Sequence, residues 1–229
     1  MYDLCQQEVS RFLKSTTEEI IISASTIPGS HILPKFIAEF RINNPNVDFK
    51  IAIKNSQKAL EDLKNGLADF AGIGSFMKFD KEDFDIINLG EDRFKFICSP
   101  NHELLKNGNN ITFDNLKSYP FIWREKGSGM RNTFKQQFRD YKKLNVKLEI
   151  NDNDSIISTV SESNYISIMS EFMINKAESA GLVKSIEINE YPIIAKRSLF
   201  FVKLKNKELS ELKKKFWNEL NSNVLKKED

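Results

Sequence analysis

The chain has 229 residues, of which 40% are hydrophobic and 29% are charged, and its formal net charge is +2. This is the composition of a globular protein with enough apolar residues for one sizeable core or two smaller ones. A nucleic-acid-binding domain usually gathers far more positive charge on one face. The near-balance of charges therefore argues against direct nucleic-acid binding by these residues.

The beginning of the sequence is polar and has neither the basic nor the apolar region of a secretory signal peptide. No apolar run approaches the roughly 20 residues that a membrane span needs. The two cysteines, Cys5 and Cys98, form no CxxC or zinc pattern. We therefore expect a cytoplasmic protein with free thiols and no membrane partner.

Residues 2–17 are predicted to form a helix. Tyr2, Cys5, Val9 and Phe12 follow the 3-4-3 spacing of a coiled-coil seam. Two heptads do not distinguish a dimerising linker helix from an amphipathic helix that caps the domain. Both interpretations stay open on this pattern alone.

After Glu19 the sequence alternates between strand and helix patterns. The apolar run Ile20–Ala24 predicts a buried strand, and a turn over residues 25–30 precedes a helix whose apolar stripe runs from Ile32 to Phe40. The series continues with a strand at 47–53, a helix at 59–63 and a strand at 69–74. Two βα units and a further strand predict a parallel sheet covered by helices.

A second α/β series follows a strand-rich stretch at residues 84–98, which Ser99-Pro100-Asn101-His102 ends. Its predicted elements are strands at 120–123, 146–150 and 165–169 and helices at 130–141, 156–160 and 172–178. The chain closes with a strand at 198–202 and a helix at 209–220. The fold class is therefore α/β with two Rossmann-like subdomains, whose ligand cleft would lie at the carboxyl ends of the strands.

The most informative local signal is the stretch Arg124–Arg131. Its Gly127-Ser128-Gly129 follows a strand and opens a helix, so the first-turn N–H groups would face the cleft with Ser128 Oγ beside them. Such a turn holds a carboxylate or an oxyanion, because the helix terminus carries partial positive charge. The alternative is a serine N-cap in a flexible loop.

Two further strand-to-helix turns carry small polar side chains. They are Ser25-Thr26-Ile27-Pro28 and Asn153-Asp154-Ser155. Either could serve only to cap its helix. Three such turns meeting at one cleft would be stronger evidence for an anion site than any one alone.

Signatures of catalysis are missing. The two histidines, His31 and His102, lack metal-ligand spacing, and no Walker A, HExxH or GxSxG motif occurs. We expect no enzyme activity, no catalytic residue, no metal and no cofactor. An enzyme on this scaffold would have Asp154 as its lone candidate group.

Four segments together resemble the effector-binding domain of LysR-type transcription regulators. They are Ile20–Pro34 at the opening, Leu63–Ala71 (similar to "L..G.lDlai"), Phe96–Leu104 (similar to "P..HpL") and Arg124–Arg131 (similar to "RE.GSGTR", with Met130 where threonine is common). The resemblance spans about residues 18–220. It implies a type 2 periplasmic-binding-protein-like fold, in which two crossing strands join the subdomains and a linker helix precedes them.

The resemblance also implies the organisation of the chain. Residues 1–17 would be the linker helix, 18–98 with 199–229 subdomain I, and 99–198 subdomain II. The winged helix-turn-helix that precedes such a linker is not in this chain. The resemblance implies dimerisation through the surface of subdomain I and the linker helix, so we expect a homodimer or homotetramer that contacts DNA only through the missing domain.

The resemblance places Ser25, Thr26, Ile27, Pro100, Ser128 and Gly129 around the effector. The complete predicted effector site adds Asp154, Ser155 and Ile168. Its ligand would be a small anionic metabolite or an inorganic oxyanion. Where the family usually has Gly-x-Gly, this chain has Ser163-Asn164-Tyr165, which predicts a narrower cleft floor near Ile166–Ile168. The alternative function is a solute-binding protein of a transporter with the same fold.

Overall fold

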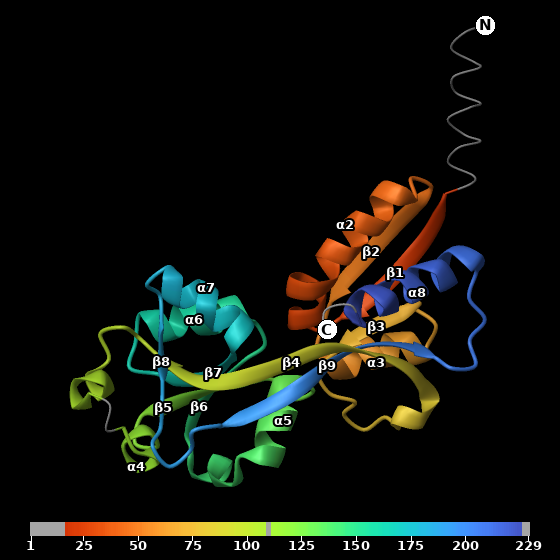
Figure 1. The fold of residues 1–229 in the computed structure, drawn as a ribbon. Coiled ribbons are helices and arrows are strands. Elements are labelled where there is room, and N and C mark those ends of the chain that lie inside the picture. Colours follow the sequence, from red (N-terminus) through yellow and green to blue (C-terminus); the bar gives the residue numbers. More distant parts are fainter. Residues whose placement is uncertain (1–16, 109–110, 226–229) are drawn as a thin grey trace, which may run out of the picture. The chain divides into compact units, whose positions relative to one another are not determined.

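The computed structural model describes residues 17–108 and 111–225 (Figure 1). The predicted linker helix, apart from its last residue, lies outside the described residues. The chain divides into two compact units, the first comprising the residues up to Leu89 and from Phe200 onward, the second Gly90–Leu199. The first boundary thus lies within a strand, whereas the sequence analysis places it after residue 98.

The first unit is built on a sheet with the strand order β2-β1-β3-β9. β1 (Glu18–Ala24) pairs in parallel with β2 (Val47–Ile53) and with β3 (Phe70–Ile73), and β9 (Ala195–Leu204) pairs antiparallel with β3. β1 is central, so its side chains need apolar neighbours on both faces. The predicted parallel sheet is confirmed.

Helices cover both faces of this sheet. α2 (Leu33–Asn43) and α8 (Glu211–Leu225) pack on one face, where they share an apolar cluster with Phe70. α3 (Ser56–Lys64) covers the other face, where its apolar side chains meet Ala71 and Ile73. Neighbouring residues of β3 therefore point to opposite faces, as the period of a strand requires.

The segment between β1 and α2 differs from the predicted turn. Residues Ile27–Ile32 form a π-helical segment, η1, which runs directly into α2. Pro28 in its first turn has no N–H to leave unpaired, and its fixed φ suits a helix start. Helical structure therefore begins almost immediately after β1, which places Ser25 at the junction.

Two strands carry the chain between the units. β4 (Phe84–Cys98) begins in the first unit and continues in the second from Gly90, and β9 returns after Leu199. Gly90 has a φ of +115°, a backbone conformation that residues with a side chain rarely adopt. The implied pair of crossing strands is thus present in the chain.

The second unit contains a sheet with the strand order β4-β7-β5-β6. β5 (Pro120–Arg124) is parallel to β6 (Asn145–Ile150) and to β7 (Ile166–Ser170), whereas β4 is antiparallel to β7. A short strand that the sequence analysis missed, β8 (Lys184–Ile186), also pairs with β4. The carboxyl ends of β5, β6 and β7 therefore meet at one edge.

Helices again cover both sheet faces. α4 (Phe113–Leu116) and α5 (Gly129–Gln137) share an apolar cluster on one face. α6 (Asn153–Ser161) and α7 (Glu171–Ser179) contact β7, and the apolar side chains of both helices are buried. Three-residue to five-residue 3-10 segments complete the elements: η2 (Lys81–Asp83), η3 (Glu103–Asn107) and η4 (Arg139–Lys143). Within the described ranges no helix has the length and apolar character to cross a bilayer.

The helix predicted over residues 130–141 is interrupted. Phe138 has an extended backbone (φ −96°, ψ 98°), so α5 ends at Gln137 and η4 follows. The Phe138 ring is buried, stacks on Phe134 with centroids 4.9 Å apart, and meets Phe113 edge-on at 5.3 Å. The aromatic packing of this core accompanies a break that helical periodicity does not reveal.

A buried ion pair links β4 and β9 inside the second unit. Asp92 is 1% exposed and accepts hydrogen bonds from Arg197 Nε (3.0 Å), Arg197 Nη2 (2.9 Å) and Ser170 Oγ (2.6 Å). Burial raises the pKa of Asp92 above its ordinary value, although Arg197 and the Ser170 hydroxyl oppose the shift. Each buried charge therefore depends on the other and on the Ser170 hydroxyl for stabilisation, because either charge alone would be poorly solvated.

Replacing Asp92 with alanine would leave the Arg197 guanidinium buried without its counter-ion. We expect Asp92→Ala to lower the free energy of unfolding by about 3–5 kcal/mol, measured by urea denaturation. Glu91→Ala, which removes the neighbouring exposed carboxylate, is the control and should change the stability little. Equal effects of the two substitutions would contradict a special role for the buried pair.

A second ionic contact joins the sheet of the first unit to α8. Asp69 Oδ2 accepts a hydrogen bond from Ile21 N (3.0 Å). The same carboxylate forms ion pairs with two lysines: Lys213 Nζ lies 2.9 Å from Oδ2, and Lys207 Nζ lies 3.4 Å from Oδ1. Burial alone would raise the pKa of Asp69, but the Ile21 amide and the two lysines outweigh it and lower the pKa. The folded unit thus favours the ionised carboxylate.

A lowered pKa in the folded state gives stability that is present above the ordinary aspartate pKa of about 4 and is lost as the pH falls below it. We expect the unfolding free energy of the wild type to drop over this acid range, and the drop to be smaller in Asp69→Asn. Denaturation midpoints measured across a pH series test this. An unchanged acid dependence in the variant would show that Asp69 does not contribute.

Candidate functional site

The turn of the first unit is fixed by its backbone. Ser25 follows β1, its N–H donates to Gly72 O (2.7 Å), and its carbonyl accepts from Gly29 N (2.9 Å). The residue is 8% exposed, yet Ser25 Oγ has no hydrogen-bond partner. Within the described residues it is the one buried side-chain nitrogen or oxygen in that condition. Because an unmatched buried hydroxyl is unfavourable, this oxygen marks a position suited to a polar ligand atom.

Two glycines allow the helix start to pack closely on the sheet beside Ser25. A Cβ at Gly72 would lie 2.8 Å from Pro28 Cβ, and a Cβ at Gly29 would lie 2.9 Å from Ala24 Cβ. Either contact is too short for real atoms, so only glycine fits without movement. Thr26 is half-buried and Ile27 buried at the same junction. The position of the Ser25 hydroxyl therefore depends on backbone packing.

The Gly127-Ser128-Gly129 turn lies at the carboxyl end of β5. Ser128 is the N-cap of α5, and its Oγ accepts from Arg131 N at 3.4 Å. The Ser128 side chain is buried and acts as the N-cap that the sequence analysis gave as an alternative to anion binding. The N–H groups of Gly129 and Met130 belong to the first helical turn, where a helix offers no internal acceptor. The turn can thus donate backbone hydrogen bonds to an anion while Ser128 stabilises the helix.

Arg124 connects this turn to the start of α6. Its Nη1 donates to Asn153 Oδ1, its Nη2 to Asn151 O (3.4 Å), and its Nε pairs with Glu125 Oε2 (2.9 Å). Both Arg124 and Asn153 are buried. Parallel pairing of β5 with β6 sets the two turns side by side. The structure therefore brings together, within the second unit, the predicted turns at Gly127–Gly129 and Asn153–Ser155.

At the Asn153–Ser155 turn, the small polar side chains mainly form hydrogen bonds that cap α6. Asp152 is the N-cap of α6, and its Oδ2 accepts from both Ser155 N and Ser155 Oγ, each at 2.7 Å. These bonds lower the pKa of Asp152. Asp154 is exposed in the first turn of the helix. The predicted role of Ser155 therefore competes with its bond to Asp152.

The edge formed by the carboxyl ends of β5 and β7 also carries groups that the sequence analysis missed. Ser170, the last residue of β7, caps α7 and donates to Asp92, which in turn holds Arg197. Burial lowers the pKa of Arg197, and the positive charge of Arg124 lowers it further against the attraction of Asp92. Each arginine also has a carboxylate partner, Asp92 for Arg197 and Glu125 for Arg124, so both positive charges at this edge are paired within the second unit.

Two predicted site residues lie elsewhere in the second unit. Pro100 follows the carboxyl end of β4, which runs antiparallel to β7, so it is at the opposite edge of the sheet from Ser128. Ile168 is 1% exposed, and its side chain belongs to the apolar core cluster. The structure does not bring these two side chains together with the turns. Strand direction explains the first case and core packing the second.

Other chemistry-bearing residues are placed in structural roles. His102 caps η3 through Nδ1, which accepts from Leu104 N (3.1 Å), and its ring meets Tyr119 edge-on at 4.6 Å. Cys98 is buried, and burial raises the pKa of its thiol to about 12; Cys5 is outside the described residues. No group of three or more potential metal-ligating His, Cys, Asp or Glu side chains occurs in the part of the chain that the structure describes.

Comparisons with known proteins agree with this arrangement. Residues 14–224 match the model of the family described as LysR substrate binding domain. An uncharacterized HTH-type transcriptional regulator of Methanocaldococcus jannaschii is 37% identical over 212 residues, which cover 90% of this chain and 70% of that relative.

Two solved structures share the fold. The effector-binding domain of QuiR in complex with shikimate has a TM-score of 0.78 at 20% identity, covering 92% of this chain and 98% of that one. The regulatory domain of CcmR from Synechocystis in complex with 2-PG has a TM-score of 0.77 at 22% identity, covering 91% and 98%. Together with the match over residues 14–224, these findings establish that the chain belongs to the family of LysR substrate-binding domains.

Proposed function

We propose that this chain is a receptor domain that binds a small anionic metabolite or an oxyanion and thereby controls transcription. The observation that carries the proposal is the buried, unpartnered Ser25 Oγ beside the start of η1. A hydroxyl in this position donates to an anionic oxygen, and the first helical turn adds partial positive charge. The bound anion would replace the hydrogen bond that the hydroxyl lacks.

In the second unit, the turn at Ser128 and Gly129 supplies the matching backbone donors. Arg124, whose guanidinium donates to Asn153 and Asn151, links this turn to the start of α6. The same turn chemistry in each unit supports one class of ligand. That both turns contact the same molecule, together with Asp154 and Ser155, stays a prediction, as do the contacts assigned to Pro100 and Ile168.

The link to transcription rests on family membership. The M. jannaschii relative is named as an HTH-type regulator, and 30% of its length lies outside the match, since the match covers 70% of it. We propose that DNA is bound by a helix-turn-helix domain outside this chain, in a cytoplasmic homodimer or homotetramer without enzyme activity. The effector would shift the regulator between two states by its differential affinity for them.

The named ligands of the two structural relatives suggest the first probes. Shikimate carries a carboxylate, and both it and 2-PG were bound by domains of this fold. A calorimetric panel of small carboxylates, phosphate esters and sulfate would test the proposal on the chain itself. Saturable binding of an anion, with no binding of its uncharged analogue, is the expected result. Absence of anion binding across the panel would overturn the proposal.

Ser25→Ala separates binding from stability. Because Ser25 Oγ is buried without a hydrogen bond, its removal should not lower the unfolding free energy and should raise it by up to about 1–3 kcal/mol. It should weaken binding of the anion found in the panel by about 1–3 kcal/mol, measured by isothermal titration. Unchanged affinity in a folded variant would remove Ser25 from the site.

Ser128→Ala should behave differently. Its hydroxyl caps α5, so the substitution should lower the unfolding free energy by about 0.5–2 kcal/mol. If Ser128 also reaches the anion, as the sequence predicts, binding weakens by about 1–3 kcal/mol. Denaturation and titration of the same sample distinguish the two roles, since a purely capping serine would show only the first effect.

A further inference from the structure

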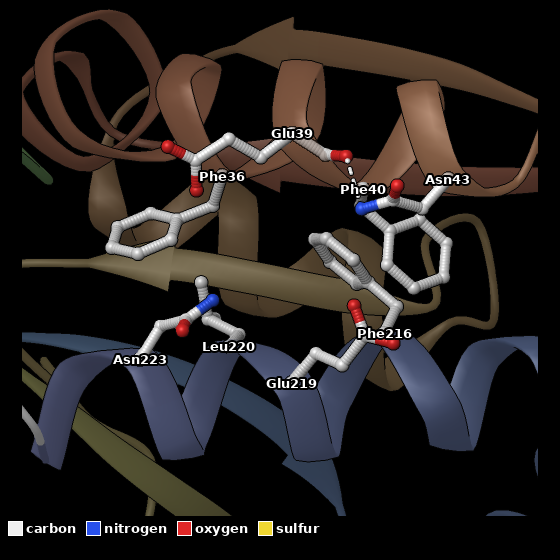
Figure 2. A pocket seen from close by; sticks show the side chains of 8 residues that line it. All are labelled: Phe36, Glu39, Phe40, Asn43, Phe216, Glu219, Leu220 and Asn223. Carbon is white, nitrogen blue, oxygen red and sulfur yellow. Dashed lines mark hydrogen bonds between the residues drawn. The ribbon is translucent and has the colours of Figure 1, made fainter.

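A pocket lies between α2 and α8 on the first unit, and the proposed anion site does not use it. It encloses about 280 Å³ and is lined by four apolar and four polar side chains, Phe36, Phe40, Phe216, Leu220, Glu39, Asn43, Glu219 and Asn223 (Figure 2). Ligand pockets usually measure about 300–1,000 Å³, so this one suits a small occupant.

The floor of the pocket is aromatic and rigid. Phe40 and Phe216 meet edge-on with ring centroids 5.1 Å apart, and Phe216 also packs on Phe49 at 5.1 Å. The four apolar lining side chains are each at most 5% exposed, so their positions are fixed by the core beneath them. The exposed strip of this floor is narrow and apolar, so it suits contact with a methylene chain.

The rim repeats one pair of side chains on both helices. Glu39 and Asn43 are four residues apart on α2, and Glu219 and Asn223 are four apart on α8, so each pair lies on one helix face. Figure 2 shows the Glu39 carboxylate beside Phe36 and the Glu219 carboxylate beside Phe216, toward opposite ends of the pocket. Negative charge is therefore present at both ends of an apolar floor.

The lysines nearest in sequence neutralise these carboxylates only loosely. Lys35 Nζ is 3.9 Å from Glu39 Oε1, and Lys215 Nζ is 3.9 Å from Glu219 Oε1. Lys215 Nζ makes its shorter bond, 2.8 Å, to Asn44 Oδ1. Helix-surface pairs at such distances contribute little, so both carboxylates remain available to a better-placed cation.

We propose that the α2–α8 pocket binds a short linear aliphatic diamine. Its methylene chain would cover the aromatic floor, one ammonium would bind Glu39 and the other Glu219, and the Asn43 and Asn223 amide oxygens would accept remaining N–H bonds. A monoamine satisfies one carboxylate only, and a diol none. The ligand's charge is opposite to that of the proposed effector, so this site is a separate one.

Isothermal titration of the 229-residue chain at about 150 mM salt tests the proposal, because that ionic strength suppresses loose counter-ion binding. The probes are putrescine, butylamine and butanediol. We expect putrescine to bind about tenfold more tightly than butylamine, and butanediol not to bind. Amide shift changes in NMR spectra should be confined to α2 and α8. Equal affinities of the two amines, or shifts spread over the acidic surface, would overturn the proposal.

Matched variants on the same helices sharpen the test. Glu39→Gln and Glu219→Gln should each weaken putrescine about tenfold, to the level of butylamine. Glu211→Gln removes an exposed carboxylate of α8 outside the pocket and should leave the affinity unchanged. Ser25→Ala should also leave putrescine binding unchanged, so failure of the anion site and failure of this site are distinguishable. A loss of affinity in Glu211→Gln equal to that in Glu219→Gln would refute a specific site.

Discussion

The close contact between the start of the first helix and the sheet is the constraint on which the first unit's site depends. Gly29 and Gly72 allow η1 to approach β1 and β3 within distances that a Cβ would prevent. That approach fixes both backbone bonds of Ser25 and leaves its hydroxyl buried and unmatched. The polar atom is thus positioned by groups that are themselves apolar or backbone, so the proposed ligand would not have to order it.

Ser25 and Ser128 both lie at a junction between a strand and a helix, yet their hydroxyl groups differ in hydrogen bonding. Ser128 Oγ satisfies an amide of its own helix, whereas Ser25 Oγ satisfies nothing within the described residues. A capped helix start is stabilised without a ligand. A buried hydroxyl without a hydrogen-bond partner lowers the stability of the free protein. Ligand binding can compensate for that cost by supplying the missing partner. The contrast identifies Ser128 as a helix cap and favours Ser25 as the serine of the proposed anion site.

Periodic apolar patterns were sufficient to predict the strands and helices whose side chains face a core, such as β1, α2 and α3. They did not reveal β8, which is only three residues long, or the break at Phe138, which accompanies tertiary aromatic packing. Local turn chemistry predicted the strand-to-helix junctions at Ser128 and Asn153, but after Ser25 it predicted a turn where the structure has the π-helical segment η1. The Asp92–Arg197 pair joins residues 105 positions apart, and Ser170 is 78 positions from Asp92. Local sequence patterns do not indicate contacts between residues so far apart in the chain. These contacts are therefore found only in the three-dimensional structure.

The proposed anion and diamine sites are connected by a continuous helical segment. Ser25 immediately precedes the helical run that continues through η1 into α2, and α2 carries Phe36, Glu39 and Phe40 of the pocket. A diamine bound between α2 and α8 would therefore contact the same helical run that begins beside Ser25. Because coupling between two ligands is reciprocal, any effect of a bound anion on diamine affinity would equal the effect of a bound diamine on anion affinity.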